Sequence, residues 1–170
     1  MPDVCIILGS DNDLKAVEES EMLNTLRVIG VSYELSVISA HRHPEELRQY
    51  VREQVDGGTL VFIGIAGMAA HLAGAIAAWS YGHRPVIGVP LVAEELQGLD
   101  ALLSMVRMPP GRPVLVTGIG KSGLQNAAIA ACQILALKEP WVAERLPQYF
   151  KANTKPVEWR IHQSPRKEFL

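Results

Sequence analysis

Short apolar segments alternate with helical segments five times along the chain, and this alternation constrains the fold more than any other feature. Each apolar segment has the length and composition of a strand that is buried on both faces of a sheet. The predicted strands cover residues 4–8, 33–38, 59–65, 85–89 and 113–117. Strands that alternate with helices form an open parallel sheet with right-handed crossovers. The sequence therefore predicts an α/β fold, and its 170 residues fit a single domain.

The predicted helices occupy the segments between and after these strands. Gly30 stops the first helix, and Pro44 opens the second at a position that suits proline. The helices are expected over residues 13–29, 44–56, 67–79, 99–106, 124–137 and 141–150. The segment 124–137 is apolar on nearly every face, and a helix of that kind must be buried. In so small a domain this pattern favours oligomerisation.

Composition and charge argue against several classes of protein. The chain is 48% hydrophobic and 20% charged, and its formal net charge is −2, without the basic bias typical of nucleic-acid-binding proteins. No segment reaches about 18 consecutive apolar residues, so we expect no membrane span. The first residues run into a strand without the pattern of a secretory signal. Cys5 and Cys132 lie in a predicted strand and helix, which favours buried free thiols and a cytoplasmic protein.

Polar side chains follow the first predicted strand in the turn formed by residues 9–13. Ligands of open α/β sheets bind beyond the carboxyl ends of the strands, where this turn lies. Ser10 could donate its hydroxyl to a phosphate, and Asp13 could accept hydrogen bonds from sugar hydroxyl groups. Plain capping of the following helix is the alternative, because serine and aspartate are common cap residues.

The densest group of reactive side chains follows the second strand. Ser39, His41 and Arg42 lie within four residues, and His43 precedes Pro44 at a helix-cap position. Histidine gives and takes protons near neutral pH, and arginine binds phosphate through two hydrogen bonds. A metal site is disfavoured, since no further ligand stands at a suitable spacing. His41 could therefore act as an acid–base group, and Arg42 could bind a phosphate.

His71 follows the third strand, so the same rule places it at the edge of the sheet where His41 lies. A lone histidine in a helix rich in small residues is often structural, so both a functional and a structural interpretation of His71 remain open.

The turn at residues 118–123 reads Gly-Ile-Gly-Lys-Ser-Gly and matches the dinucleotide fingerprint. No strand with an acidic ribose ligand follows its helix, so a tight strand-to-helix turn is favoured there.

Taken together, the motifs resemble those of the PurE family, whose members make carboxyaminoimidazole ribonucleotide. The resemblance covers about residues 4–137. Its motifs are Gly-Ser-x-x-Asp at 9–13, Ser-Ala-His-Arg-x-Pro at 39–44, Ala-Gly-x-Ala-Ala-His-Leu at 66–72, Pro-Val-Ile-Gly-Val-Pro at 85–90, Met-Pro-x-Gly-x-Pro-Val at 108–114, and Gly-Ile-Gly-Lys at 118–121 followed by Asn126-Ala127-Ala128. Each motif alone is weak, but their order and spacing are highly specific.

The resemblance implies a three-layer flavodoxin-like fold, a homo-octamer, and a ribonucleotide substrate with neither a metal nor an organic cofactor. It implies that His41 is the general acid–base and that His71 lines the pocket of the base. The residues implied to hold the ribose phosphate are Ser10, Asp13 and Arg42, with Ser39 nearby. The segment around His71 resembles the mutase branch, which moves a carboxylate from N5 to C4 of aminoimidazole ribonucleotide. Direct carboxylation of that nucleotide and a non-catalytic nucleotide-binding oligomer are the alternatives.

Several positions depart from the family pattern. Asn12 stands in place of the usual serine, His43 in place of threonine, and Ala73 in place of proline. Ile65 and Met68 occupy positions often held by glycine, and we expect them to narrow the pocket or stiffen its loop. The segment 79–84 is about two residues longer than usual. We assign residues 1–155 to the catalytic domain and residues 156–170 to a tail that could pack on a neighbouring subunit.

Overall fold

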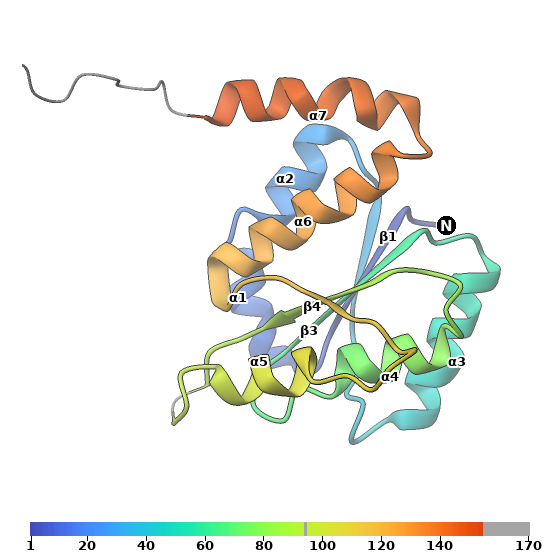
Figure 1. The fold of residues 1–170 in the computed structure, drawn as a ribbon, viewed down its shortest axis with the longest axis vertical. Helices are drawn as coiled ribbons and strands as arrows, with labels where there is room; N and C mark the ends of the chain where they lie inside the picture. The colour runs from blue at the N-terminus through green and yellow to red at the C-terminus, as the bar shows by residue number, and fades with distance from the viewer. Residues whose placement is uncertain (94, 155–170) are drawn as a thin grey trace, which may run out of the picture.

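Five parallel strands form one sheet in the order β2-β1-β3-β4-β5 (Figure 1). The computed structural model describes residues 1–93 and 95–154, so the predicted tail lies outside the described residues. The strands are β1 (Val4–Leu8), β2 (Tyr33–Val37), β3 (Val61–Ala66), β4 (Val86–Pro90) and β5 (Leu115–Val116). This strand order is that of flavodoxin-like sheets, in which the order reverses between β1 and β3. The predicted fold class is confirmed.

Helices cover both faces of the sheet and complete the three layers. Figure 1 shows one layer below the sheet, made of α3 (Pro44–Asp56), α4 (Leu72–Trp79) and α5 (Leu99–Val106). The opposite layer contains α1 (Leu14–Glu18), α2 (Met22–Ile29) and α6 (Gly120–Ala136), with α7 (Pro140–Asn153) outermost. A short 3₁₀ turn, η1 (Asp11–Asp13), connects β1 to α1.

The strands divide their side chains between two separate cores, one on each face of the sheet. Val4 and Ile6 belong to the core under α2 and α6, whereas Cys5 and Ile7 belong to the core under α3 and α4. Successive side chains of a strand point to opposite faces, so a strand covered on both sides must be apolar throughout. This is why the buried strands read as uninterrupted apolar runs.

Both cysteines are buried free thiols, as the sequence predicted. Burial raises the pKa of Cys5 and of Cys132 to about 12. The thiol of Cys5 also lies 3.4 Å from the hydroxyl of Tyr50, which in turn donates a hydrogen bond to Glu34. A thiol that stays protonated is a poor nucleophile, so these cysteines are structural.

Among the described residues, no helix is long and apolar enough to cross a membrane.

The first predicted helix, 13–29, is broken into η1, α1 and α2. The break lies at Ser20, whose hydroxyl donates to the carbonyl of Val17 at 2.8 Å and accepts the N–H of Met22 at 3.2 Å. Serine competes with helical backbone hydrogen bonding in this way, and here it ends one helix and begins the next. The predicted end at Gly30 is confirmed, with a φ of 93° and a backbone N–H bonded to the carbonyl of Leu26.

Two other helix boundaries differ from the sequence prediction. The helix expected from residue 67 begins only at Leu72, because Met68 has a φ of 55° and cannot belong to a right-handed helix. The helix expected from residue 124 begins earlier, at Gly120, directly after the glycine-rich turn. Residues 67–71 therefore form a loop at the edge of the sheet, which matters for the site.

Contacts within the chain account for the apolar surface of α6. Its residues Leu124, Ala128 and Cys132 are buried in one core, and α6 packs extensively on both α2 and α7. Helix α7 adds Val142 and Leu146 to the same core. Because α2, α7 and the sheet surround α6, the apolar pattern of this helix needs no second subunit. The apolar pattern of α6 is therefore explained by packing within the chain and does not by itself indicate oligomerisation.

Small residues bring α4 close to the sheet. Gly64 of β3 lies opposite Gly88 of β4, and a Cβ at either glycine would contact Ala73, at 3.2 Å and 3.4 Å respectively. Ala73 is fully buried between them. Ala73 therefore belongs to the packing of α4 on the sheet and does not line the cavity described below.

Candidate active site

A cavity of about 470 Å³ opens at the carboxyl ends of β1, β2 and β3, where the strand order reverses. All of the site residues predicted from the sequence line this cavity: Ser10, Asp13, Ser39, His41, Arg42 and His71. They come from three turns that are distant in the sequence but follow neighbouring strands. The topology of a parallel sheet is the reason that they meet.

His41 and His71 form a hydrogen-bonded pair in the cavity. Nε2 of His41 lies 2.9 Å from Nδ1 of His71, and the two rings meet edge to face, with an interplanar angle of 85°. One nitrogen must donate and the other accept, so this bond requires at least one neutral imidazole. Such a pair can hold one mobile proton beside a bound substrate while fixing the orientation of both rings.

Ser10 and Asp13 form a capping box around η1. The carboxylate of Asp13 accepts the backbone N–H of Ser10 at 3.1 Å, and the hydroxyl of Ser10 accepts the N–H of Asn12 at 3.3 Å. Both side chains also line the cavity, so capping and ligand binding are compatible here. Burial raises the pKa of the Asp13 carboxyl, while the Ser10 N–H opposes that shift.

Arg42 presents an exposed cationic group at the cavity. Its backbone N–H is bonded to the hydroxyl of Ser39 at 3.3 Å, which holds the turn, and its side chain is exposed. Within the described ranges, its guanidinium makes no ion pair or hydrogen bond. An uncompensated arginine at a cavity rim can bind a phosphate through two N–H groups.

Next along the chain, His43 is the N-cap residue of α3 but makes no side-chain cap bond. Its Nδ1 lies 3.9 Å from a carboxylate oxygen of Glu46, and His43 does not line the cavity. The neighbouring histidines 41 and 43 therefore lie in different environments.

Of the two residues that were expected to narrow the pocket, Ile65 and Met68, only Met68 lines the cavity. Ile65 is fully buried in the core under α2 and α6 and does not line the cavity, so it cannot narrow the pocket. Its side chain faces away because strand residues alternate between the two faces. Met68 does line the cavity, as does Asn12. The sequence interpretation missed Val92 and Ala93, which also line it and follow β4 at the same edge of the sheet.

Met68→Gly is expected to raise the free energy of unfolding by about 0.5–1 kcal/mol. The left-handed conformation costs a residue with a Cβ about 1–2 kcal/mol, and the greater chain entropy of glycine offsets part of that gain. Urea denaturation measures the difference. Met68→Ala is the control, because alanine keeps the Cβ and the strain. A lower unfolding midpoint for Met68→Gly would contradict the strain argument.

Packing accounts for the glycine-rich turn at residues 118–123. A Cβ at Gly123 would lie 1.5 Å from the carbonyl oxygen of Gly118, so the absence of a side chain at Gly123 allows the chain to turn back on itself. Gly120 has a φ of 69°, and the hydroxyl of Thr117 donates to the Gly123 carbonyl at 2.9 Å. The helix that follows leads into α7 and no strand. The interpretation as a tight turn is confirmed.

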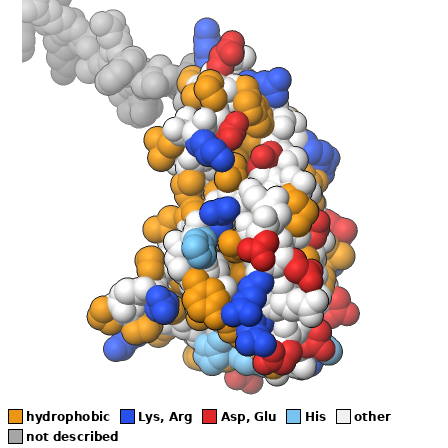
Figure 2. Space-filling view, turned by 90° about the vertical axis from the view of Figure 1, so that its right-hand side faces the viewer, with side chains coloured by type: hydrophobic (Ala, Val, Ile, Leu, Met, Phe, Trp, Pro, Cys, Tyr) orange, Lys and Arg blue, Asp and Glu red, His pale blue; other side chains and the backbone are white. Residues whose placement is uncertain are grey.

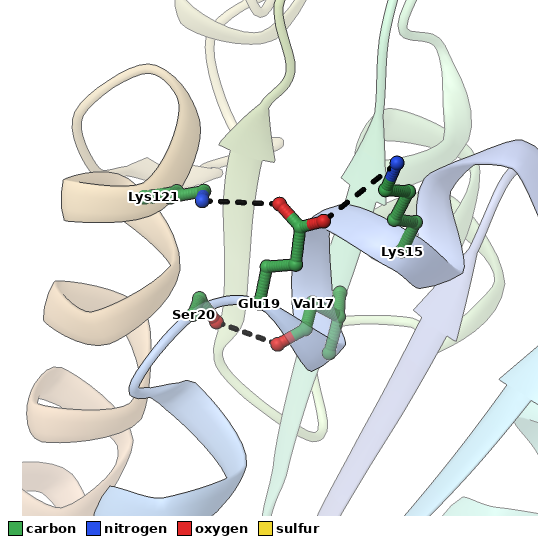
Figure 3. A network of polar contacts seen from close by, with 5 residues as sticks. All are labelled: Lys15, Val17, Glu19, Ser20 and Lys121. Carbon is green, nitrogen blue, oxygen red and sulfur yellow. Dashed lines mark hydrogen bonds and ion pairs between the residues drawn. The ribbon is translucent and has the colours of Figure 1, made fainter.

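Lys121 of this turn connects α6 to α1. Its Nζ lies 3.1 Å from one carboxylate oxygen of Glu19, and Nζ of Lys15 lies 3.8 Å from the other (Figure 3). The lysines hold the pKa of the Glu19 carboxyl below its usual value, mainly through the hydrogen bond from Lys121. Lys121 therefore forms an ion pair outside the cavity, where it links two helices at the surface.

Charge on the surface is mixed, and metal-binding clusters are absent from the described part of the chain. Figure 2 shows acidic and basic side chains interspersed over one face of the molecule. Residues 1–93 and 95–154 contain no group of three or more side chains that could hold a metal ion. Among the described residues that line the cavity, the basic side chains are Arg42 and the histidine pair.

Comparison with known proteins identifies the family of this chain. A profile of the family described as AIR carboxylase matches residues 3–156. The chain belongs to this family. Among its relatives, the N5-carboxyaminoimidazole ribonucleotide mutase of Pyrococcus abyssi is 48% identical over 88% of this chain and 82% of its own length. The mutase of the same name from Thermotoga maritima is 39% identical over 100% of this chain and 98% of its own length.

The fold of this chain is also similar to that of a solved structure named PurE. The AIR carboxylase fold of this chain superposes on Treponema denticola PurE with a TM-score of 0.75 and 25% identity, over 88% of this chain and 90% of that chain. The fold and the sequence relatives therefore agree on one family.

Proposed function

We propose that this protein converts N5-carboxyaminoimidazole ribonucleotide to 4-carboxy-5-aminoimidazole ribonucleotide in purine biosynthesis. The observation that carries the proposal is the His41–His71 pair, joined at 2.9 Å in a cavity that Arg42 also lines. The relatives from Pyrococcus abyssi and Thermotoga maritima bear the name of this mutase. An acid–base pair next to a phosphate-binding cation suits a ribonucleotide whose ring must gain and lose protons.

In the proposed reaction, His41 carries out both proton transfers. Protonation of the exocyclic nitrogen weakens its bond to the carboxylate. The C–N bond then breaks, carbon dioxide is released, and a neutral amine remains on the ring. The electron-rich C4 then attacks the carbon dioxide, which forms the new C–C bond. The proton on C4 returns to His41 and restores aromaticity. His71 holds the His41 ring in place through their hydrogen bond during both proton transfers.

The other cavity residues bind the ribose phosphate. Arg42 supplies an exposed guanidinium, and Ser10 lies at the turn after β1 with a hydroxyl that can donate to a phosphate oxygen. Asp13 accepts hydrogen bonds from the ribose hydroxyl groups, and Ser39 holds the Arg42 turn through the bond to its N–H. The substrate is thereby oriented with its ring toward the histidine pair, which supplies the proximity that the chemistry requires.

Product formation from two alternative substrates tests the proposed function. The purified protein is given either freshly made N5-carboxyaminoimidazole ribonucleotide or aminoimidazole ribonucleotide with excess bicarbonate, and product is followed by ultraviolet absorbance. Fast product from the N5-carboxy substrate alone is expected. Efficient product from aminoimidazole ribonucleotide and carbon dioxide would show a direct carboxylase instead. Binding of the nucleotide without any product would show a non-catalytic protein.

Arg42→Ala is expected to raise KM by about 10- to 100-fold with a smaller effect on kcat. Its free guanidinium forms charge-assisted bonds with the phosphate in the ground state and the transition state alike, so the loss is mainly in binding. Steady-state kinetics measure both constants. Arg48→Ala is the matched control, because Arg48 pairs with Glu45 at 3.0 Å on α3 and lies outside the cavity. An unchanged KM for Arg42→Ala would place the phosphate elsewhere.

We further propose that residues 1–155 act as one catalytic domain within a cytoplasmic homo-octamer. Support for self-association comes from α5, where Leu99, Leu103 and Val106 form an apolar stripe about half exposed to solvent. Exposed apolar patches of this kind mark protein–protein contacts. The buried free thiols suit a reducing compartment. Light scattering is expected to give eight times the 18.6 kDa chain mass, and Leu103→Glu is expected to lower it.

A further inference from the structure

Met68 lines the cavity, but the acid–base chemistry does not use it. It lies in the loop of residues 67–71, between β3 and His71. The residue is 67% exposed and yet contributes to the cavity wall, so it lies at the rim. The thioether of methionine is apolar and flexible, and it can cover a ligand of irregular shape.

The backbone of Met68 is strained in a way that glycine would avoid. Its φ of 55° lies in the left-handed region, which a residue with a Cβ occupies only at an energetic cost. Such outliers cluster at ligand clamps and active sites, where the surroundings hold them in place. The strain brings a large apolar side chain to the rim, at a position where a glycine would leave the cavity more open.

Other apolar groups line the same cavity. Val92 is 56% exposed and lies on the loop after β4, while Leu72 and Ala66 are buried. Together with Met68 they make an apolar wall near the histidine pair. Carbon dioxide is small, uncharged and weakly hydrated, so an apolar wall suits it better than it suits water or bicarbonate.

We propose that Met68 is a positioning residue that retains carbon dioxide between the two halves of the mutase reaction. This inference rests on the proposed function. When the N5–carboxylate bond breaks, N5 keeps the proton from His41 and carbon dioxide is free until C4 attacks it. Escape at that moment leaves aminoimidazole ribonucleotide in the site, and the new C–C bond must then form with carbon dioxide from solution. Met68 covers the rim and makes recapture faster than escape.

An isotope experiment separates recapture from escape. The unlabelled N5-carboxy substrate is mixed with the enzyme in buffer that contains ¹³C-bicarbonate and carbonic anhydrase. Mass spectrometry then gives the ¹³C fraction of the 4-carboxy product and the amount of aminoimidazole ribonucleotide released. Wild-type product is expected to be mostly unlabelled. Met68→Gly is expected to raise the labelled fraction about fivefold, which corresponds to lowering the escape barrier by about 1 kcal/mol.

Three further variants make the result specific. Met68→Leu keeps an apolar side chain at the rim and is expected to retain the label pattern of the wild type. Met68→Ala also removes most of the side chain. It takes the place of the Met68→Gly variant in the experiment if that variant does not fold. Tyr81→Gly relieves another left-handed residue, with a φ of 51°, outside the cavity, and is expected to leave the labelled fraction unchanged.

The possible results separate this inference from the proposed function. Normal turnover of Met68→Gly with a labelled fraction equal to that of the wild type would overturn the role of Met68. Fully labelled wild-type product would overturn it too, because the carbon dioxide would then exchange freely. An equal rise in Tyr81→Gly would trace the effect to backbone strain and overturn it. No product from wild type would overturn the proposed function, and this inference with it.

Discussion

Replacing His41 by asparagine is expected to lower kcat by about 10³-fold while nucleotide binding persists. General acid–base groups contribute about 10²–10⁴-fold to rate, and His41 is proposed to transfer both protons. Binding persists because Arg42, Ser10 and Asp13 remain in the cavity. Rapid-quench or absorbance kinetics measure kcat, and calorimetry measures the affinity for aminoimidazole ribonucleotide. Turnover within a few-fold of the wild type would remove His41 from this role.

His43→Asn is the matched control for that experiment. The two histidines are separated by a single residue, but His43 lies outside the cavity beside Glu46. Its replacement is therefore expected to leave kcat unchanged. A similar loss in both variants would mean that the turn had been disrupted rather than that a proton-transfer group had been removed.

The histidine pair also explains why His71 needs its own variant. Nδ1 of His71 contacts Nε2 of His41. His71→Asn would therefore loosen the orientation of the His41 ring but would leave the His41 imidazole, the proposed proton-transferring group, in place. The pH profile of kcat distinguishes the two roles, because a residue that only orients His41 lowers the rate without removing a titrating group from the profile. Loss of one limb of the profile would instead show direct proton transfer by His71.

Replacing Gly123 by alanine is expected to lower the free energy of unfolding by at least about 3 kcal/mol or to prevent folding. A Cβ at Gly123 would lie 1.5 Å from the Gly118 carbonyl oxygen, which is a backbone atom and cannot rotate away. The turn would have to open, which would displace the start of α6 and disturb both the core and Thr117. Urea denaturation measures the loss, and soluble yield reports a failure to fold.

Gly118→Ala controls for the Gly123→Ala experiment within the same turn. A Cβ at Gly118 would meet its nearest atoms at 3.7 Å, an ordinary van der Waals separation. Its substitution is therefore expected to change the free energy of unfolding by less than about 1 kcal/mol. Equal losses at both positions would contradict the close contact between Gly118 and Gly123 and would point to a general intolerance of side chains in the turn.

Local sequence patterns were enough to predict the layers and the edge of the sheet that carries the site. Apolar runs of strand length, with helical segments between them, dictate a parallel sheet covered on both faces. Because all strands then point the same way, the turns after them must share one edge, and this placed Ser10, His41 and His71 together. The start of α3 at Pro44 and the end of α2 at Gly30 were predictable because caps are local.

Features that depend on contacts between distant segments came only from the tertiary structure. The 2.9 Å bond between His41 and His71 joins residues thirty apart, and no local pattern specifies it. The burial of α6 by α7 removed a reason to invoke a second subunit, since α7 supplies the apolar cover. The left-handed Met68 shortened α4 and put a side chain at the cavity rim. Periodicity and capping are encoded within a few residues, whereas packing and strain depend on the whole surroundings of a residue.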